Sequence, residues 1–237
     1  MLPPEPLKTS IDLVVQDVTH AHIIENVDLT QRYSLTGQYM MAAARFARNC
    51  GAVERQNVGR PFGPFFDEIF QFATGAVLFS VFSLESHLND VRSDPKIAIQ
   101  YNALLADLKR TKKPSSMVNR FDLALKVNNV ATFDESSPLY NAAEVLANFR
   151  NRLVHFEPHS SGDQEAKNLT LGEKLKSRFH LSPFVPEGHG PIFPLRCMSH
   201  AATVWAVVTA RTFMHEFDNR MGRVHCLDLH SDDLGTE

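Results

Sequence analysis

Residues 64–92, PFFDEIFQFATGAVLFSVFSLESHLNDVR, form the segment that decides the fold. Drawn as a helix, the segment is apolar around most of its circumference, which is typical of a helix at the centre of a bundle. Asp94-Pro95 ends it, because a proline disfavours helical geometry in the residue before it. The uncharged part, Ile69–Leu84, is about 16 residues long, whereas a membrane-spanning helix needs roughly 20. We therefore predict a buried core helix and no membrane partner.

Helical patterns with recognisable ends flank this segment on both sides. The spacing of apolar residues predicts further helices at about 35–49, 97–110, 116–126, 137–156 and 195–221. Gly51 is expected to stop the first of them, and Glu157-Pro158 the helix that Ser137-Pro138 begins. A Pro/Gly-rich loop is expected at 158–194, interrupted by a short helix near 171–178.

The chain divides into three parts along its length. Residues 1–34 are expected to form an irregular N-terminal arm, with enough β-branched residues for short strands at 11–18 and 22–27. Residues 35–222 hold the helical patterns, and residues 223–237 form a polar tail that we expect to fray. With no internal repeat, this organisation predicts an all-α protein, a helical bundle of four to five core helices.

The overall composition limits the class of protein and its compartment. Hydrophobic residues make up 43% of the chain and the net charge is −3, so any contact with RNA must be local rather than spread over a basic surface. Cys50, Cys197 and Cys226 are far apart, which argues against a disulfide framework and indicates a reducing compartment. The N-terminus lacks a basic stretch followed by an apolar run, so we expect no secretory signal and a cytoplasmic protein.

The residues that suggest chemistry lie at 150–155, RNRLVH, inside the helix predicted over 137–156. On a helical wheel, Asn151 and His155 are one turn apart and project together, away from the apolar stripe. Arg150 lies at the edge of that stripe, between Leu146 and Leu153. An arginine in this position needs a partner, because an unpaired buried charge is costly.

The long apolar segment offers that partner. Glu85 falls within its apolar face, and Asn89 lies one turn further along. We predict that Glu85 pairs with Arg150 where the two central helices cross, since a bidentate contact would fix the guanidinium beside Asn151 and His155. Polar residues expected on the opposite face of this helix are Ser83, Ser86, His87 and Asp90.

With these residues in view, the chain resembles the HEPN superfamily. The family motif is an arginine, usually followed by a polar residue, with a histidine four to six residues on, and Arg150-Asn151-x-x-x-His155 fits it. The segment at 82–89, FSLESHLN, is similar to the acidic second-helix segment common in that family. The resemblance covers roughly residues 64–220, although only these two segments are specific.

The resemblance implies a bundle of four to five helices that dimerises and cleaves RNA without a metal. His155 would act as general base or acid, Arg150 would hold charge on the phosphate, and Asn151 would orient the histidine or the phosphate. A two-fold dimer would supply the second proton-transfer group. Asn148 and Glu144 lie on the same helical face as His155. They are therefore expected to line the groove where the two copies of this helix meet in the dimer.

Other interpretations of the same residues stay open at this point. A non-catalytic HEPN-like module could bind RNA or a protein partner such as an antitoxin, for example through the 158–194 loop. An inert helical adaptor would leave Asn151 and His155 on a solvated polar face. The basic run at 109–113, KRTKK, suits a solvated loop or a phosphate-facing patch. No P-loop, dinucleotide fingerprint or complete metal-ligand set occurs, so we expect no cofactor.

Overall fold

A computed structural model describes residues 34–110, 116–157, 163–189, 191–225 and 227–237, and this part of the chain is all helical. This confirms the predicted fold class. The predicted strands at 11–18 and 22–27 and most of the basic run at 109–113 lie outside the described residues. In chain order the elements are α1 (Thr36–Gln56), α2 (Phe65–Arg92), α3 (Pro95–Arg110), α4 (Met117–Val127), α5 (Pro138–Val154), α6 (Asp163–Lys176), η1 (Ile192–Arg196), α7 (His200–Met221) and η2 (Asp228–Leu234).

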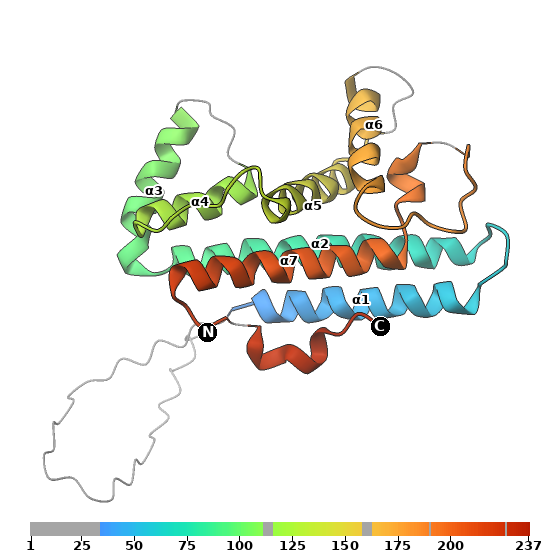
Figure 1. The fold of residues 1–237 in the computed structure, drawn as a ribbon, viewed down its shortest axis with the longest axis horizontal. Helices are drawn as coiled ribbons and strands as arrows, with labels where there is room; N and C mark the ends of the chain where they lie inside the picture. The colour runs from blue at the N-terminus through green and yellow to red at the C-terminus, as the bar shows by residue number, and fades with distance from the viewer. Residues whose placement is uncertain (1–33, 111–115, 158–162, 190, 226) are drawn as a thin grey trace, which may run out of the picture. The chain divides into compact units, whose positions relative to one another are not determined.

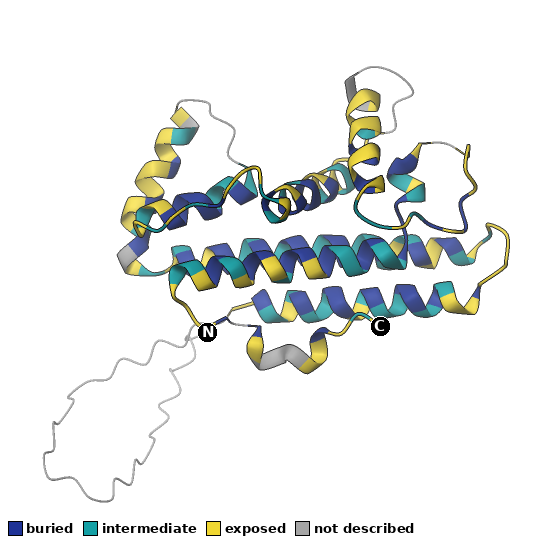
Figure 2. Cartoon of the chain, viewed as in Figure 1, coloured by how far each residue is buried: buried dark blue, intermediate teal, exposed yellow. Residues whose placement is uncertain are grey.

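Three long helices form the base of the bundle. Helices α1, α2 and α7 pack against one another side by side, and α4 and α5 pack on α2 and α7 from the side away from α1 (Figure 1). The short element η2 packs on α1. Figure 2 shows buried residues along the facing sides of the long helices, whereas α3 is mostly exposed. Burial of these apolar faces is the main favourable contribution to folding.

Helix α2 has the central place that its composition predicted. It packs against α1, α7, α5, α4 and α3, and its fully buried side chains include Ile69, Val77 and Leu84. Within the described residues, it is the one helix long and apolar enough to cross a membrane by length and composition. In this fold the same apolar residues form the contacts between the layers of the bundle.

Aromatic side chains join α4 to α7. The Phe121 ring centroid lies 4.9 Å from that of Phe217 and 5.2 Å from that of Phe213, both nearly edge to face. Phe133, in the connection before α5, stacks on Phe213 at 4.6 Å. Such aromatic pairs contribute about 0.5–1.5 kcal/mol beyond the area that they bury. This cluster fixes α4 and the start of α5 on α7.

The first helix is longer than predicted. It continues through Gly51 to Gln56, so the prediction that Gly51 ends it is wrong. A Cβ atom at position 51 would lie 2.9 Å from the His200 imidazole, which is closer than packed side chains approach. The glycine therefore lets the start of α7 approach α1 and does not act as a helix cap.

The motif helix and the last helix are both shorter than predicted. Helix α5 ends at Val154 rather than Phe156, because Pro158 disfavours helical geometry in the residues just before it. Helix α7 starts at His200, where the Ser199 side chain accepts a hydrogen bond from the backbone N–H of Ala202. The predicted start near Leu195 instead belongs to η1, a separate turn that contains Pro194.

Tertiary packing also orders two segments that look irregular in the sequence. Helix α6 extends over 14 residues rather than the short helix predicted near 171–178, and its Leu171 and Leu175 are buried. We expected the C-terminal tail to fray, but it packs on the bundle: Leu227 and Leu234 are buried, and η2 lies on α1. Arg48 of α1 donates hydrogen bonds to two backbone carbonyl groups of the tail.

Two polar residues of α2 occupy a different face from the predicted one. Ser83 and His87 are buried rather than solvated, because the face of α2 that carries them packs against α7. His87 Nε2 donates to Asp218 Oδ1 (2.8 Å), and His225 Nδ1 donates to Asp218 Oδ2 (2.7 Å). The carboxylate can only accept, so each of these ring nitrogens carries a hydrogen atom. Burial alone would raise the pKa of Asp218, but the hydrogen bonds from His225 and His87 outweigh it and lower the pKa.

The Asp218 network makes the folding stability depend on pH in a defined direction. Because the pKa of Asp218 is lower in the folded state, its stabilisation is complete above the unfolded pKa of about 4 and is lost as the pH falls through the folded value. Asp218→Asn should lower the free energy of unfolding by about 2 kcal/mol at pH 6, and the difference from wild type should shrink towards pH 3. Urea titrations at several pH values measure this, with the exposed Asp67→Asn as control; a constant difference would contradict it.

Candidate functional site

The predicted ion pair between the two central helices is present. Arg150 Nη2 of α5 donates to Glu85 Oε1 of α2, and the arginine side chain is only 16% exposed. The guanidinium carbon also lies 5.8 Å from the centre of the Phe82 ring. Burial lowers the pKa of Arg150. An arginine guanidinium nevertheless keeps its proton near neutral pH, because it is a very weak acid.

Asn151 continues this contact towards the surface. Arg150 Nη1 donates to Asn151 Oδ1 at 2.8 Å, so Glu85, Arg150 and Asn151 are joined in a row by hydrogen bonds. We call these three residues the arginine chain. Each terminal nitrogen of the guanidinium carries a second N–H group, which leaves donors for a phosphate oxygen. Within the described residues, the amide NH₂ group of Asn151 has no hydrogen-bond partner and is free to contact a ligand.

His155 stands apart from this chain at the end of the helix. It is the C-cap residue of α5 with φ −110° and ψ 40°, and its backbone N–H donates to Asn151 O. The direction of its side chain is therefore set by the cap and not by the helical wheel used for the prediction. The imidazole is exposed and makes no hydrogen bond to any described residue, so it is accessible to a ligand or a partner chain.

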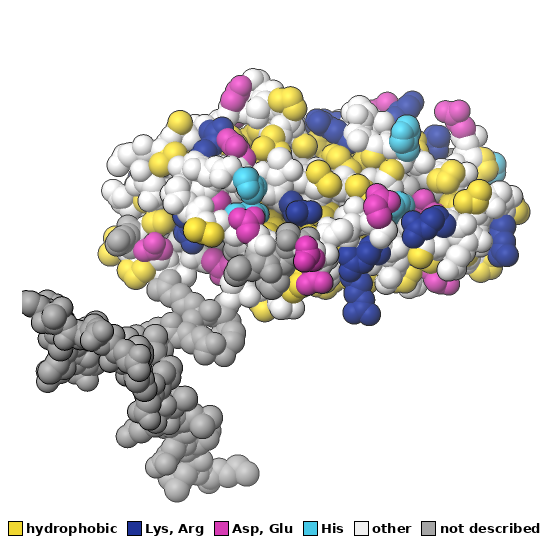
Figure 3. Space-filling model, turned by 60° about the horizontal axis from the view of Figure 1, so that its bottom comes forward, with side chains coloured by type: hydrophobic (Ala, Val, Ile, Leu, Met, Phe, Trp, Pro, Cys, Tyr) yellow, Lys and Arg dark blue, Asp and Glu magenta, His cyan; other side chains and the backbone are white. Residues whose placement is uncertain are grey.

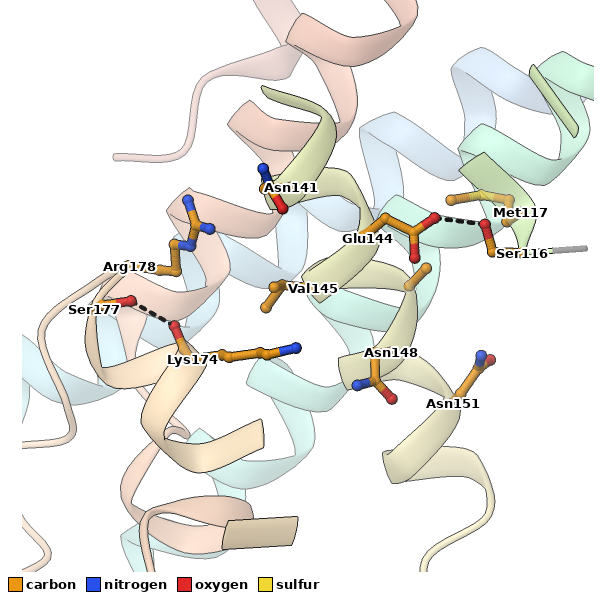
Figure 4. A pocket seen from close by; sticks show the side chains of 11 residues that line it. Ser116, Met117, Asn141, Glu144, Val145, Asn148, Asn151, Lys174, Ser177 and Arg178 are labelled. Atoms are coloured by element: carbon orange, nitrogen blue, oxygen red, sulfur yellow. Dashed lines mark hydrogen bonds between the residues drawn. The ribbon is translucent and has the colours of Figure 1, made fainter. Parts of the chain in front are cut away.

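Two other polar residues of α5, Glu144 and Asn148, line a groove beside Asn151. Asn151 also lines it, whereas His155 does not, so it is a different groove from the one predicted between two copies of this helix (Figure 4). Glu144 is partly committed elsewhere, because its carboxylate accepts a 2.5 Å hydrogen bond from Ser116, the N-cap residue of α4. One side of the groove is thus hydrogen-bonded to α4 through Glu144, and the other is hydrogen-bonded to Arg150 through Asn151.

Asn89 does not join the arginine chain. It is exposed on α2, and its side-chain oxygen accepts a long 3.4 Å hydrogen bond from Arg92. Of the predicted supporting residues, Glu85 alone contacts Arg150, since the α2 residue one turn further on lies beyond the reach of the crossing helix.

Several other lining residues of the groove were not foreseen, among them two cations and an asparagine. Lys174 and Arg178 line it from α6 and the turn that follows, and Asn141 lines it from the start of α5. The positions of the two cations could not be predicted, because α6 has few apolar residues and its position follows from packing on α5 and η1. The helical wheel could have placed Asn141, which is two turns before Asn148.

The arrangement provides a specific but limited chemistry. Arg150 offers a fixed cation for a phosphate, and His155 offers one exposed proton-transfer group. The described part of the chain holds no group of three His, Cys, Asp or Glu residues placed to bind a metal ion. On the face seen in Figure 3, acidic and basic side chains are interspersed, so recognition by charge depends on local groups.

Comparisons of this chain with protein-family models, with curated proteins and with solved structures gave no match.

The coupling between Glu85 and Arg150 can be measured by a double-mutant cycle with Glu85→Ala and Arg150→Ala. Each change should destabilise the fold, and the coupling energy should be about 1 kcal/mol, kept small by the 40% exposure of Glu85. The free energy of unfolding in urea is the measurement. The control cycle uses the exposed pair Arg110 and Asp107 of α3, for which we expect at most about 0.3 kcal/mol. Equal coupling in the two cycles would contradict a defined role for the Glu85 contact.

Proposed function

We propose that this protein is a metal-independent endoribonuclease of HEPN type. The observation that carries the proposal is the hydrogen-bonded set Glu85–Arg150–Asn151, which holds a cation in place on α5, five residues before the exposed imidazole of His155. The spacing of arginine and histidine resembles the HEPN motif, and the all-α bundle suits that family. The biological setting that this resemblance suggests is a cytoplasmic toxin, defence or RNA-processing factor.

The proposed reaction is an internal transfer of the phosphate. His155 takes the proton of the 2′-hydroxyl group, the 2′ oxygen bonds to phosphorus, and the bond from phosphorus to the 5′ oxygen breaks. The products are a 2′,3′-cyclic phosphate and a 5′-hydroxyl end, the latter after the leaving oxygen takes up a proton. Arg150 stabilises the charge on the non-bridging oxygens, and Asn151 positions the phosphate.

A second copy of the chain would complete this site. One imidazole can serve as base or as acid in a single step, whereas the leaving oxygen needs its own proton donor. Val154 and Phe156, on either side of His155, are 50% and 44% exposed. Apolar side chains in such a position favour contact with a partner, and a two-fold axis here would bring two copies of His155 together. We therefore propose a homodimer.

A non-catalytic binding module is the second candidate function. One observation favours it: Glu85 already pairs with Arg150 and offsets the charge that a phosphate would otherwise meet. Such a module would bind RNA or a protein partner such as an antitoxin without cleaving the RNA. A stable dimer that binds RNA but leaves it intact would favour this function over the nuclease.

His155→Ala tests the catalytic role. Because it removes the proton-transfer group, the change should reduce cleavage of an RNA oligonucleotide in EDTA by at least about 100-fold, while the melting temperature stays unchanged. Gel analysis and detection of cyclic-phosphate ends measure the reaction. The matched control is His189→Ala, an exposed histidine in the loop before η1. Undiminished cleavage by the His155 variant would reject the mechanism.

A further inference from the structure

A groove beside the arginine chain has features of a binding site of its own. It encloses about 380 Å³ between α4, α5 and α6, within the range of small-molecule sites. Val145 and Ala147 also line it, and both are buried. Figure 4 shows Lys174 reaching from α6 towards Asn148 on α5. Opposite walls therefore bring polar groups to one cavity that apolar side chains also line.

Several polar groups of the groove are already used within the protein. The Asn141 amide NH₂ donates to the backbone oxygens of Glu135 and Ser137. Glu144 accepts a hydrogen bond from Ser116, which also caps α4. These contacts hold the α4 side of the groove in a fixed shape, and they leave the remaining groups to determine what it binds.

The uncommitted groups are mostly donors. Lys174 and Arg178 form no ion pair with any described residue, and Asn148 makes no side-chain hydrogen bond within the same part of the chain. The Nε atom of Arg178 is buried and has no hydrogen-bond partner among the residues that the structure describes. Two cations against the single carboxylate of Glu144 leave the groove locally positive in a chain whose net charge is −3. A ligand with a phosphate group suits these free donors and this positive charge, because phosphate oxygens accept hydrogen bonds from arginine and lysine.

The remaining features select an unpaired nucleotide. An asparagine amide both donates and accepts, and so it can read the edge of a base. That edge is accessible only when the base is unpaired, since side chains cannot read the deep groove of an RNA duplex. The apolar side chains of Val145 and Ala147 offer van der Waals contact to the face of the base.

Asn151 connects the groove to Arg150. Its side-chain oxygen accepts from Arg150, and the same side chain lines the groove. We infer that the groove binds one unpaired nucleotide of the RNA, next to the phosphate held by Arg150. Lys174 and Arg178 hold the phosphate of that nucleotide, and Asn148 contacts its base. This inference rests on the proposed function for the identity of the ligand, but its binding step can be tested without cleavage.

The test measures binding of a labelled single-stranded RNA and of the same sequence as a duplex, in the His155→Ala background so that no RNA is cleaved. Lys174→Gln should weaken single-strand binding about tenfold and reduce the slope of log K against log salt by about 0.7, the value for one lost phosphate contact. Lys176→Gln, an exposed lysine of α6 outside the groove, should change neither. Asn148→Ala should make the affinities for the four single-stranded RNA homopolymers, poly(A), poly(C), poly(G) and poly(U), more alike, because it removes the contact with the base.

The outcomes separate this inference from the nuclease proposal. Equal effects of the two lysine changes, equal affinity for duplex and single strand, or no RNA binding would overturn the inference. In the His155-intact protein, Lys174→Gln should raise KM and leave kcat unchanged. Groove-dependent binding with no cleavage by wild type would reject the nuclease and keep the binding site. RNA cleavage with a KM that Lys174→Gln does not change would keep the nuclease proposal and reject the groove as the nucleotide site.

Discussion

One partly buried ion pair determines how the rest of the site is arranged. Arg150 projects from α5 into the crossing with α2, where an uncompensated charge would be strongly destabilising. Glu85 satisfies it, and the contact fixes the guanidinium against Phe82. Because such pairs contribute little net stability, we interpret its main effect as positional. The fixed guanidinium in turn orients Asn151, which borders the groove.

The end of α5 sets the second constraint. Pro158 makes continuation of the helix unfavourable, and so His155 takes the capping position rather than another helical turn. The imidazole there is exposed, whereas Arg150, five residues earlier, is held against α2. A fixed cation and an accessible proton-transfer group thus arise from local sequence and one tertiary contact.

The sequence was sufficient for features that depend on local chemistry. The ends of α2, the Ser137 cap of α5 and the pairing of Glu85 with Arg150 follow from proline, capping and the cost of a buried charge. It failed where packing between distant segments decides. His87 is buried because Asp218, far along the chain, supplies its partner, and Gly51 stays helical because α7 approaches it closely. The cations of the groove depend in the same way on where α6 packs.

The geometry of α5 also bears on whether a dimer and an RNA strand can occupy the site together. Asn148, Asn151 and Val154 follow one another at intervals of three, so each is turned by about 60° from the one before. The helix surface therefore passes in order from the polar groove, through the residue bonded to Arg150, to the exposed apolar end beside His155. A partner copy that covers Val154 and Phe156 would approach next to the groove without filling it. In the proposed homodimer, two such copies would leave one groove on each side of a shared pair of imidazoles, and the proposed RNA strand would then cross the dimer axis.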